Sequence, residues 1–164
     1  FYNRLINDER IKKALKENGY KGKFCVHTNN IANASDFCGN EVIEVSADIV
    51  DYQKEFRENA LLITDYSSVA YDFAYLKKPV IYAQPDKEEF FAEQIYDRGY
   101  WDYEQMGFGP VCCDYESTVN VIIEAVRSGC MLEKEYLNRI ESFYFALDQN
   151  NCERVYQAIR EIGK

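Results

Sequence analysis

The segment from Leu61 to Pro79 contains the residues whose types and spacing best suit the binding of an anion. An apolar run ends at Asp65, and Ser67 and Ser68 follow just before a helical pattern begins. The first turn of a helix has free backbone N–H groups, and serine hydroxyls beside them add further donors. This arrangement suits a phosphate group. Serine is also a common N-cap, so an ordinary helix cap without a ligand is the alternative interpretation.

Two further strand ends carry polar residues. His27, the only histidine of the chain, follows an apolar strand and precedes Thr28. Because histidine titrates near neutral pH, His27 could act as a general acid or base, or donate to a phosphate oxygen. A histidine satisfied in the core or in a loop is the alternative. Ser46 and Asp48 follow a second strand, where an N-cap is the simpler interpretation and a contact with a flat base the other.

Short apolar strands alternate with helix-length segments along the whole chain. The expected helices lie at 3–18, 47–59, 69–78, 86–97, 116–128, 133–145 and 151–162, and the expected loops at 28–40 and 98–110. Apolar strands that are separated by helices are typical of a parallel sheet covered on both faces. The sequence therefore predicts an α/β fold with a Rossmann-like parallel sheet and helices on both faces.

Right-handed crossovers predict a single five-stranded parallel sheet. Its expected spatial order is 42–45, 24–27, 61–64, 80–83, 111–113. Sheets of this kind bind ligands at the carboxyl ends of their strands, near the point where the strand order reverses. The polar residues that follow the strands should therefore lie along one edge of the sheet.

Length and charge limit the classes of function. With 164 residues the chain is long enough for one domain, 1–164, that has a real core. Its net charge of −9 argues against non-specific nucleic-acid binding and requires local features to hold an anion. No apolar run approaches the length of a transmembrane span. The six cysteines form no Cys-x-x-Cys pair and indicate reduced thiols in a cytosolic protein, so no metal site is expected.

Three segments together resemble one protein family. The stretch LLITDYSSVAYDFAYLKKPVIYAQPDKEEF (61–90) is similar to the core motif of the CDP-glycerol:poly(glycerophosphate) glycerophosphotransferases, which are teichoic-acid-type polymerases. Downstream, RGYWDYEQMGFGPV (98–111) resembles an aromatic-rich segment of that family, and FYFALDQNNCERVYQAI (143–159) resembles its closing motif. The resemblance extends from about Phe24 to Ile159, in the order found in the family.

The resemblance implies one half of a GT-B architecture, which has two Rossmann-like domains. This chain resembles the C-terminal, donor-binding domain, and it begins at a helix where that domain normally opens with a strand. Ser67 and Ser68 would hold the diphosphate of CDP-glycerol. His27 would lie near the reacting phosphate, next to Thr28, which stands where the family has proline and is a further binding candidate.

The same resemblance implies a reaction and its partners. Asp65 and Asp72 match the motif, and Ser46 follows another strand end; each of the three could bind substrate or be structural. The full-length protein would transfer glycerol phosphate, or a related polyol phosphate, from CDP-glycerol to a hydroxyl of an anionic polymer and release CMP. It would use no cofactor and would act in the cytoplasm, at the inner face of the membrane.

The resemblance also assigns the acceptor site to a domain that this chain lacks, so the isolated chain should be inactive. Two other functions remain open. One is a glycosyltransferase or epimerase domain that uses a sugar nucleotide. This is disfavoured because the helix after Ser68 offers Asp72, and no glutamate, to grip a ribose. The other is a non-catalytic nucleotide-binding module, because fold alone does not fix function.

Overall fold

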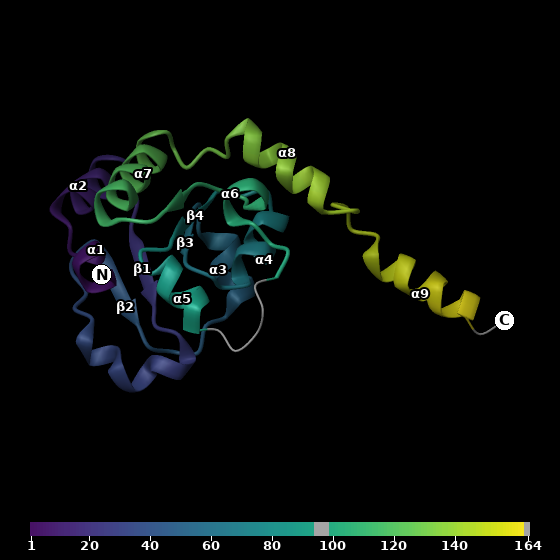
Figure 1. The fold of residues 1–164 in the computed structure, drawn as a ribbon, viewed down its shortest axis with the longest axis horizontal. Coiled ribbons are helices and arrows are strands. Elements are labelled where there is room, and N and C mark those ends of the chain that lie inside the picture. The colour runs from purple at the N-terminus through teal and green to yellow at the C-terminus, as the bar shows by residue number, and fades with distance from the viewer. Residues whose placement is uncertain (94–98, 163–164) are drawn as a thin grey trace.

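The computed structural model describes residues 1–93 and 99–162, and for 28–30 it gives the backbone without the side chains. The strands are β1 (Gly22–Cys25), β2 (Ile43–Ser46), β3 (Leu62–Thr64), β4 (Val80–Ala83) and β5 (Val111–Cys112). The helices are α1 (Tyr2–Ile6), α2 (Glu9–Glu17), α3 (Tyr52–Glu58), α4 (Val69–Tyr75), α5 (Lys87–Glu93), α6 (Tyr103–Met106), α7 (Tyr115–Arg127), α8 (Lys134–Phe143) and α9 (Asn151–Ile162), with a 3-10 helix η1 at Thr28–Asp36. Figure 1 shows their arrangement.

All strand pairs are parallel, but they form two sheets. β1 pairs with β2, and β3, β4 and β5 form a second sheet with β4 in its centre. The predicted single five-stranded sheet is therefore wrong, and β3 lies at an edge of its own sheet. The predicted neighbours within each group are correct. Within the described residues no backbone hydrogen bond joins β1 to β3, and a cavity lies between these two strands.

Helices cover both faces of the strands, as the sequence predicts. On one face, α1, α2 and α7 pack their apolar side chains against Ile81 and Cys112, and α2 packs on α7. On the other face, Phe73 of α4 and Ile140 of α8 pack against Val80 and Tyr82. Alternate residues of β4 thus enter opposite cores, because successive side chains of a strand point to opposite faces. The α/β fold class is confirmed.

Some element boundaries differ from the predicted ones. The helix expected at 3–18 is divided into α1 and α2, because the Asp8 side chain accepts a hydrogen bond from the Arg10 amide and caps a new helix. The helix expected at 47–59 begins only at Tyr52, where Asp51 caps it by accepting from the Lys54 amide. Asp48 and Ser46 therefore do not cap this helix.

Four further predictions concern segments around these elements. The loop expected at 28–40 contains η1, and the loop expected at 98–110 contains the short helix α6. The last strand ends one residue earlier than expected, at Cys112, and Cys113 is exposed. The helix expected at 86–97 is described as α5, and its last residues, 94–97, lie outside the described part of the chain.

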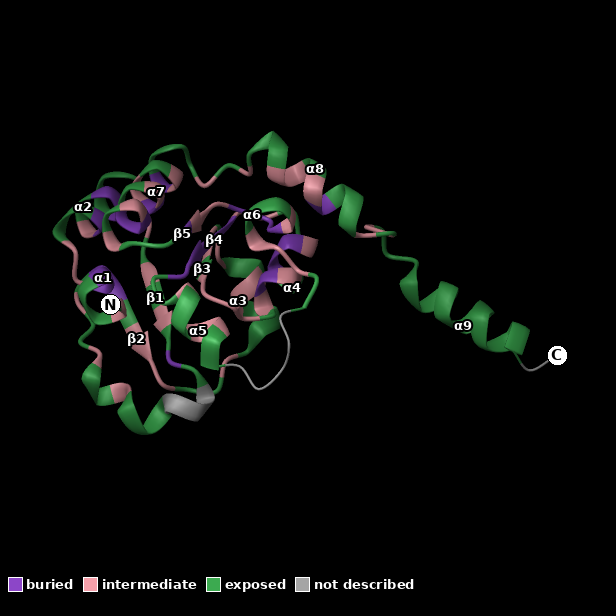
Figure 2. Cartoon of the chain, in the orientation of Figure 1, coloured by how far each residue is buried: buried purple, intermediate pink, exposed green. Residues whose placement is uncertain are grey.

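The C-terminal helix α9 differs from the rest of the molecule in its burial. It extends away from the body of the domain (Figure 1), and none of its residues is buried (Figure 2). Its exposed apolar side chains are Val155, Tyr156, Ile159 and Ile162. Across residues 1–93 and 99–162, the helices are all too short or too polar to cross a membrane.

Candidate active site at the carboxyl edge of the strands

Asp65 shapes the turn that connects β3 to α4. Its Oδ1 accepts hydrogen bonds from the Tyr66 amide at 2.7 Å and the Ser67 amide at 3.2 Å. Its carbonyl oxygen accepts a hydrogen bond at 3.1 Å from Nε2 of Gln84, which is completely buried at the end of β4. Asp65 thus fixes the turn to the neighbouring strand. The Asp65 carboxylate already accepts from the Ser67 amide, so this amide is not among the free N–H groups of the turn.

Ser68 lies at the N-cap position of α4, but its hydroxyl forms no capping hydrogen bond. Its backbone has helical dihedral angles, φ −64° and ψ −15°, whereas a capping serine usually has extended ones. Among the described residues, the amides of Ser68 and Val69 have no hydrogen-bond acceptor, and the Ser67 and Ser68 hydroxyls have no partner. The ordinary serine cap is therefore not what this structure shows.

A cavity of about 450 Å³ brings several of the predicted residues together. His27 lines it from the end of β1, and Asp65 and Ser67 line it from the end of β3. His27 is exposed, and the other two are partly buried. The imidazole, the carboxylate and the serine hydroxyl thus share one opening at the carboxyl edge. The side chain of Thr28, also predicted to bind, lies outside the described part of the structure.

Ser46 and Asp72, like Ser68, are not part of this cavity lining. Ser46 ends β2, where its Oγ accepts from the Asp48 amide at 3.4 Å, so the side chain closes a turn. Asp72 is exposed on α4. Burial raises the pKa of Tyr144, the residue that follows α8, and the negative charge of Asp72 adds to the effect. Within the described residues, neither side chain joins His27 and Ser67.

The structure reveals an aromatic wall beside the serine turn that the sequence analysis did not assign. Tyr66 donates from its hydroxyl to Oδ1 of Asp86 at 2.9 Å, and its ring stacks on Phe90 with centroids 3.6 Å apart. Tyr103 donates to the Tyr66 carbonyl at 3.3 Å. Burial, followed by the hydrogen bond to Asp86, raises the pKa of Tyr66, which stays neutral at physiological pH. Asp86 lies within the quoted stretch 61–90, and this was the signal in the sequence that could have identified it.

Tyr2 also belongs to this edge, although it is distant in sequence. Its hydroxyl donates to the carbonyl of Ala83, the last residue of β4, at 3.3 Å, and its side chain lines the cavity. Burial raises the pKa of Tyr2, and the charges of Asp65 and Asp86 raise it further. Two carboxylates therefore surround this part of the edge. An anionic ligand here depends on directed hydrogen-bond donors, since the local carboxylates oppose it.

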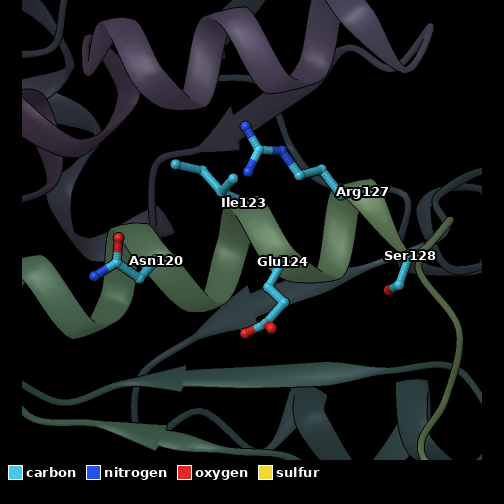
Figure 3. A pocket seen from close by; sticks show the side chains of 5 residues that line it. All are labelled: Asn120, Ile123, Glu124, Arg127 and Ser128. Atoms are coloured by element: carbon cyan, nitrogen blue, oxygen red, sulfur yellow. The ribbon is translucent and has the colours of Figure 1, made fainter.

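Another hollow lies elsewhere on the surface. Figure 3 shows it along α7, lined by Asn120, Ile123, Glu124, Arg127 and Ser128. All of these residues lie on α7 or just after it, and none follows a strand. This hollow contains none of the predicted site residues. Among the described residues, no group of three or more His, Cys, Asp or Glu side chains is arranged to hold a metal ion.

Comparison with known proteins gives consistent relatives. The chain is 39% identical over 161 residues to the minor teichoic acid biosynthesis protein GgaB of Bacillus subtilis. That match covers 98% of this chain but 17% of GgaB. A teichoic acid poly(glycerol phosphate) polymerase of Bacillus spizizenii is 36% identical over 95 residues, which are 57% of this chain and 22% of that polymerase. The chain thus spans less than a quarter of the length of either relative.

The fold has a solved counterpart. The structure of the wall teichoic acid polymerase TagF aligns with a TM-score of 0.54 at 15% identity, covering 99% of this chain and 51% of that one. Residues 1–161 match the CDP-glycerol:poly(glycerophosphate) glycerophosphotransferase family. The sequence resemblance is thereby confirmed, and the chain belongs to the CDP-glycerol:poly(glycerophosphate) glycerophosphotransferase family.

Proposed function

We propose that this chain is the donor-binding domain of a transferase that moves glycerol phosphate, or a related polyol phosphate, from CDP-glycerol to a polymer hydroxyl. Membership of the family supports the donor class and the type of reaction. The observation that carries the proposal is the shared opening at the carboxyl edge, where His27, Asp65 and Ser67 line one cavity. The acceptor site belongs to another part of the full-length protein.

The serine turn is assigned to the diphosphate of the donor. Four donors are available there: the Ser67 and Ser68 hydroxyls and the Ser68 and Val69 amides, none of which has an acceptor among the described residues. Asp65 holds the turn by its two hydrogen bonds to backbone amides, so these donors keep their directions without a ligand. Donors arranged in advance bind developing negative charge without further reorganisation.

The reaction forms one phosphodiester bond and breaks one bond of the diphosphate. The acceptor oxygen bonds to the β-phosphorus while the bond from that phosphorus to the bridging oxygen breaks. CMP departs with the bridging oxygen and its electron pair, and His27 takes the proton of the acceptor hydroxyl. The chain contributes positioning and charge stabilisation, which are the main contributions of a protein to phosphoryl transfer.

Calorimetric titration of the 164-residue chain tests the donor site. We expect CDP-glycerol or CDP-ribitol to bind more tightly than CMP, since CMP lacks the second phosphate, and more tightly than UDP-sugars. Replacing both Ser67 and Ser68 by Ala should weaken CDP-glycerol binding by roughly tenfold or more, given ~1.5–3 kcal/mol for hydrogen bonds to a charged group. Equal affinity of the variant would contradict the assignment.

A matched control separates binding from folding. Ser128 follows α7, and its hydroxyl donates to the Ala125 carbonyl rather than facing the cavity. Ser128→Ala should therefore leave CDP-glycerol affinity unchanged. Tighter binding of UDP-sugars would favour a sugar-nucleotide enzyme. Binding of CMP as tight as that of CDP-glycerol would favour a nucleotide-sensing module.

His27 is assigned to the chemistry and not to the affinity. In the full-length protein, His27→Ala should lower turnover much more than it lowers donor binding by this domain, since general acid–base groups contribute typically 10²–10⁴-fold to rate. The isolated chain should release no CMP from CDP-glycerol above background. Turnover by this chain alone would show that the acceptor site is not in another domain. The proposed place of action is the cytoplasm, peripherally at the inner face of the membrane.

A further inference from the structure

Tyr66 lies in the serine turn between two residues that line the donor cavity, but its own side chain points elsewhere. Asp65 and Ser67 line the cavity, and Tyr66 is not part of the described lining. Its partly buried side chain leaves the turn toward Phe90 of α5 and Tyr103 of α6. Tyr66 therefore contacts the body of the fold on one side and is bonded covalently to donor-site residues on the other. An effect of this side chain on a ligand passes through the backbone of the turn.

The first turn of α5 holds the Tyr66 side chain at both its ring and its hydroxyl. The ring stacks on Phe90 with centroids 3.6 Å apart and an interplanar angle of 5°. The hydroxyl donates to Oδ1 of Asp86 at 2.9 Å. Asp86 and Phe90 are joined in turn, because the Asp86 carbonyl accepts from the Phe90 amide at 2.8 Å. The stacking partner and the hydrogen-bond acceptor of Tyr66 thus belong to one helical turn and hold the side chain together.

Side chains from two other elements hold consecutive carbonyl groups of the turn. Nε2 of Gln84, at the end of β4, donates to the Asp65 carbonyl at 3.1 Å, and the Tyr103 hydroxyl donates to the Tyr66 carbonyl at 3.3 Å. The amide at the other end of the Tyr66–Ser67 peptide donates to the Asp65 carboxylate at 3.2 Å. A peptide unit is planar, so two hydrogen bonds at its opposite ends fix the orientation of the whole plane.

The hydrogen-bond donors assigned to the diphosphate follow this peptide directly along the chain. They are the hydroxyls of Ser67 and Ser68 and the amides of Ser68 and Val69, which have no acceptor among the described residues. A rotation of the Tyr66–Ser67 peptide therefore changes the direction of all of them at once. A misplacement of about 1 Å in a reacting geometry can lower a rate by about 10²-fold. The contacts of Tyr66 are thus placed to control how these donors meet a ligand.

We propose that Tyr66 is a positioning residue for the donor: held by Asp86 and Tyr103, it fixes the serine turn so that the free donors of the turn point at the diphosphate of CDP-glycerol. This inference rests on the proposed function, which assigns the serine turn to the diphosphate. It adds that affinity and rate depend on a tyrosine hydroxyl and a carboxylate that lie outside the donor cavity. The Tyr66 hydroxyl acts through Asp86, so the two side chains form one functional unit.

Calorimetric titration with CDP-glycerol tests the role of the hydroxyl. Tyr66→Phe keeps the ring on Phe90 and removes only the hydrogen bond to Asp86, so affinity should fall by about three- to tenfold. Tyr75→Phe is the matched control. Tyr75 ends α4 outside the described cavity lining, and its hydroxyl donates to the Ala146 carbonyl at 3.3 Å. This control should bind CDP-glycerol as the wild type does.

Variants of Asp86 test whether Tyr66 acts through it. Asp86→Ala removes the acceptor and should weaken CDP-glycerol binding as much as Tyr66→Phe does. Asp86→Asn keeps an oxygen that accepts from the Tyr66 hydroxyl, so it should retain affinity close to that of the wild type. The double variant Tyr66→Phe/Asp86→Ala should bind no more weakly than either single variant, because both remove the same hydrogen bond. Losses of affinity that add in the double variant would overturn the proposal.

Steady-state kinetics of the full-length protein separate positioning from folding. Tyr66→Phe should lower kcat by about tenfold or more and raise the KM for CDP-glycerol by a smaller factor, since donors arranged in advance act most strongly on developing charge. Wild-type affinity, kcat and KM in Tyr66→Phe would overturn the proposal, whatever the melting temperature of the variant.

The serine variant distinguishes this failure from failure of the proposed function. If replacing Ser67 and Ser68 by Ala weakens CDP-glycerol binding but Tyr66→Phe does not, the positioning role alone is wrong. If the double serine variant binds CDP-glycerol as tightly as the wild type, the donor site is wrong and the role of Tyr66 is overturned with it.

Discussion

The two groups of strands differ in how completely their residues are enclosed. All four residues of β4 are buried, because β3 and β5 flank it and helices cover both faces (Figure 2). In β1 the burial alternates between partly buried and exposed, although helices also lie on both sides of it. The difference lies in the sheet layer: among the described strands, β4 pairs on both edges, whereas β1 pairs with β2 alone. A strand is fully buried when helices cover both of its faces and strands pair with both of its edges. Among the described residues, β1 has three of these four neighbours: the two helical layers and β2.

The residues that follow the strands also differ between the two groups, and those after β3 are held more firmly than those after β1. After β3, Asp65, Gln84 and Tyr66 hold the chain by hydrogen bonds to backbone or side chain. After β1, His27 is exposed at the mouth of the cavity. The phosphate-binding side of the proposed site is thus arranged in advance by the three-stranded sheet.

The largest expected effect is the loss of a ring from the core of the three-stranded group. Phe73 is 1% exposed and packs between α4 and β4, so Phe73→Ala should lower the free energy of unfolding by about 3–5 kcal/mol. Phe24 of β1 is only partly buried, and Phe24→Ala should cost about half as much or less. Urea titration of both variants measures the two losses of unfolding free energy and thus their ratio. Equal losses would remove the distinction between the two groups.

A second pair of variants compares glycines at the two sheets. A Cβ at Gly109 would lie 1.7 Å from the carbonyl oxygen of Val80, so Gly109→Ala must move β4 away from the segment before β5 and should cost about 2–3 kcal/mol. A Cβ at Gly22 would lie 2.9 Å from Cγ1 of Ile43, a side-chain atom that can turn aside. Gly22→Ala should therefore cost less. Thermal melts of the two variants measure both losses of stability. A larger loss of stability for Gly22→Ala than for Gly109→Ala would contradict the comparison.

Asp8 connects the helices that bridge the two groups. Its side chain is 9% exposed, caps α2, and accepts hydrogen bonds from the Arg10 guanidinium and from the Tyr115 hydroxyl at 2.9 Å on α7. The Arg10 hydrogen bond, the largest cause, holds the pKa of Asp8 well below its usual range. The folded state then binds fewer protons than the unfolded state. This stability is present above the unfolded pKa of about 4 and is lost as pH falls through the folded value.

Asp8→Asn should remove that pH dependence. We expect a loss of about 1–2 kcal/mol at pH 7, since a capping side chain and its charge are altered, and a flatter decline in stability from about pH 5 downward. Unfolding curves measured at pH 7, 5 and 3 check this. As a control, Glu9→Gln alters an exposed carboxylate in an i,i+3 ion pair with Lys12 and should change stability by no more than about 0.5 kcal/mol. An unchanged acid slope in Asp8→Asn would show that Asp8 does not couple α2 to α7.

The sequence predicts the three-stranded group and the serine turn well because their signals are local. The apolar run 61–64, the Asp65 turn and the helix from Val69 follow one another within a few residues. The break between β1 and β3 has no local signal, because both segments have the residue pattern of ordinary apolar strands. The Tyr66–Asp86 hydrogen bond and the Tyr2 contact with Ala83 join residues 20 and 81 positions apart. Spacing alone cannot place such residues together.

The smallest expected effect distinguishes a ligand site from a helix cap. Because the Ser68 hydroxyl makes no capping hydrogen bond, Ser68→Ala should change the free energy of unfolding by no more than about 0.5 kcal/mol. Asp65→Ala removes the acceptor of two amides in the same turn and should cost about 1–2 kcal/mol. Parallel thermal melts and CDP-glycerol titrations separate the two roles, since Ser68→Ala should lose affinity at nearly constant stability. If Ser68→Ala lowers stability as much as Asp65→Ala does, the serine hydroxyl supports the fold, and the donors assigned to the diphosphate are reduced to the backbone amides and Ser67.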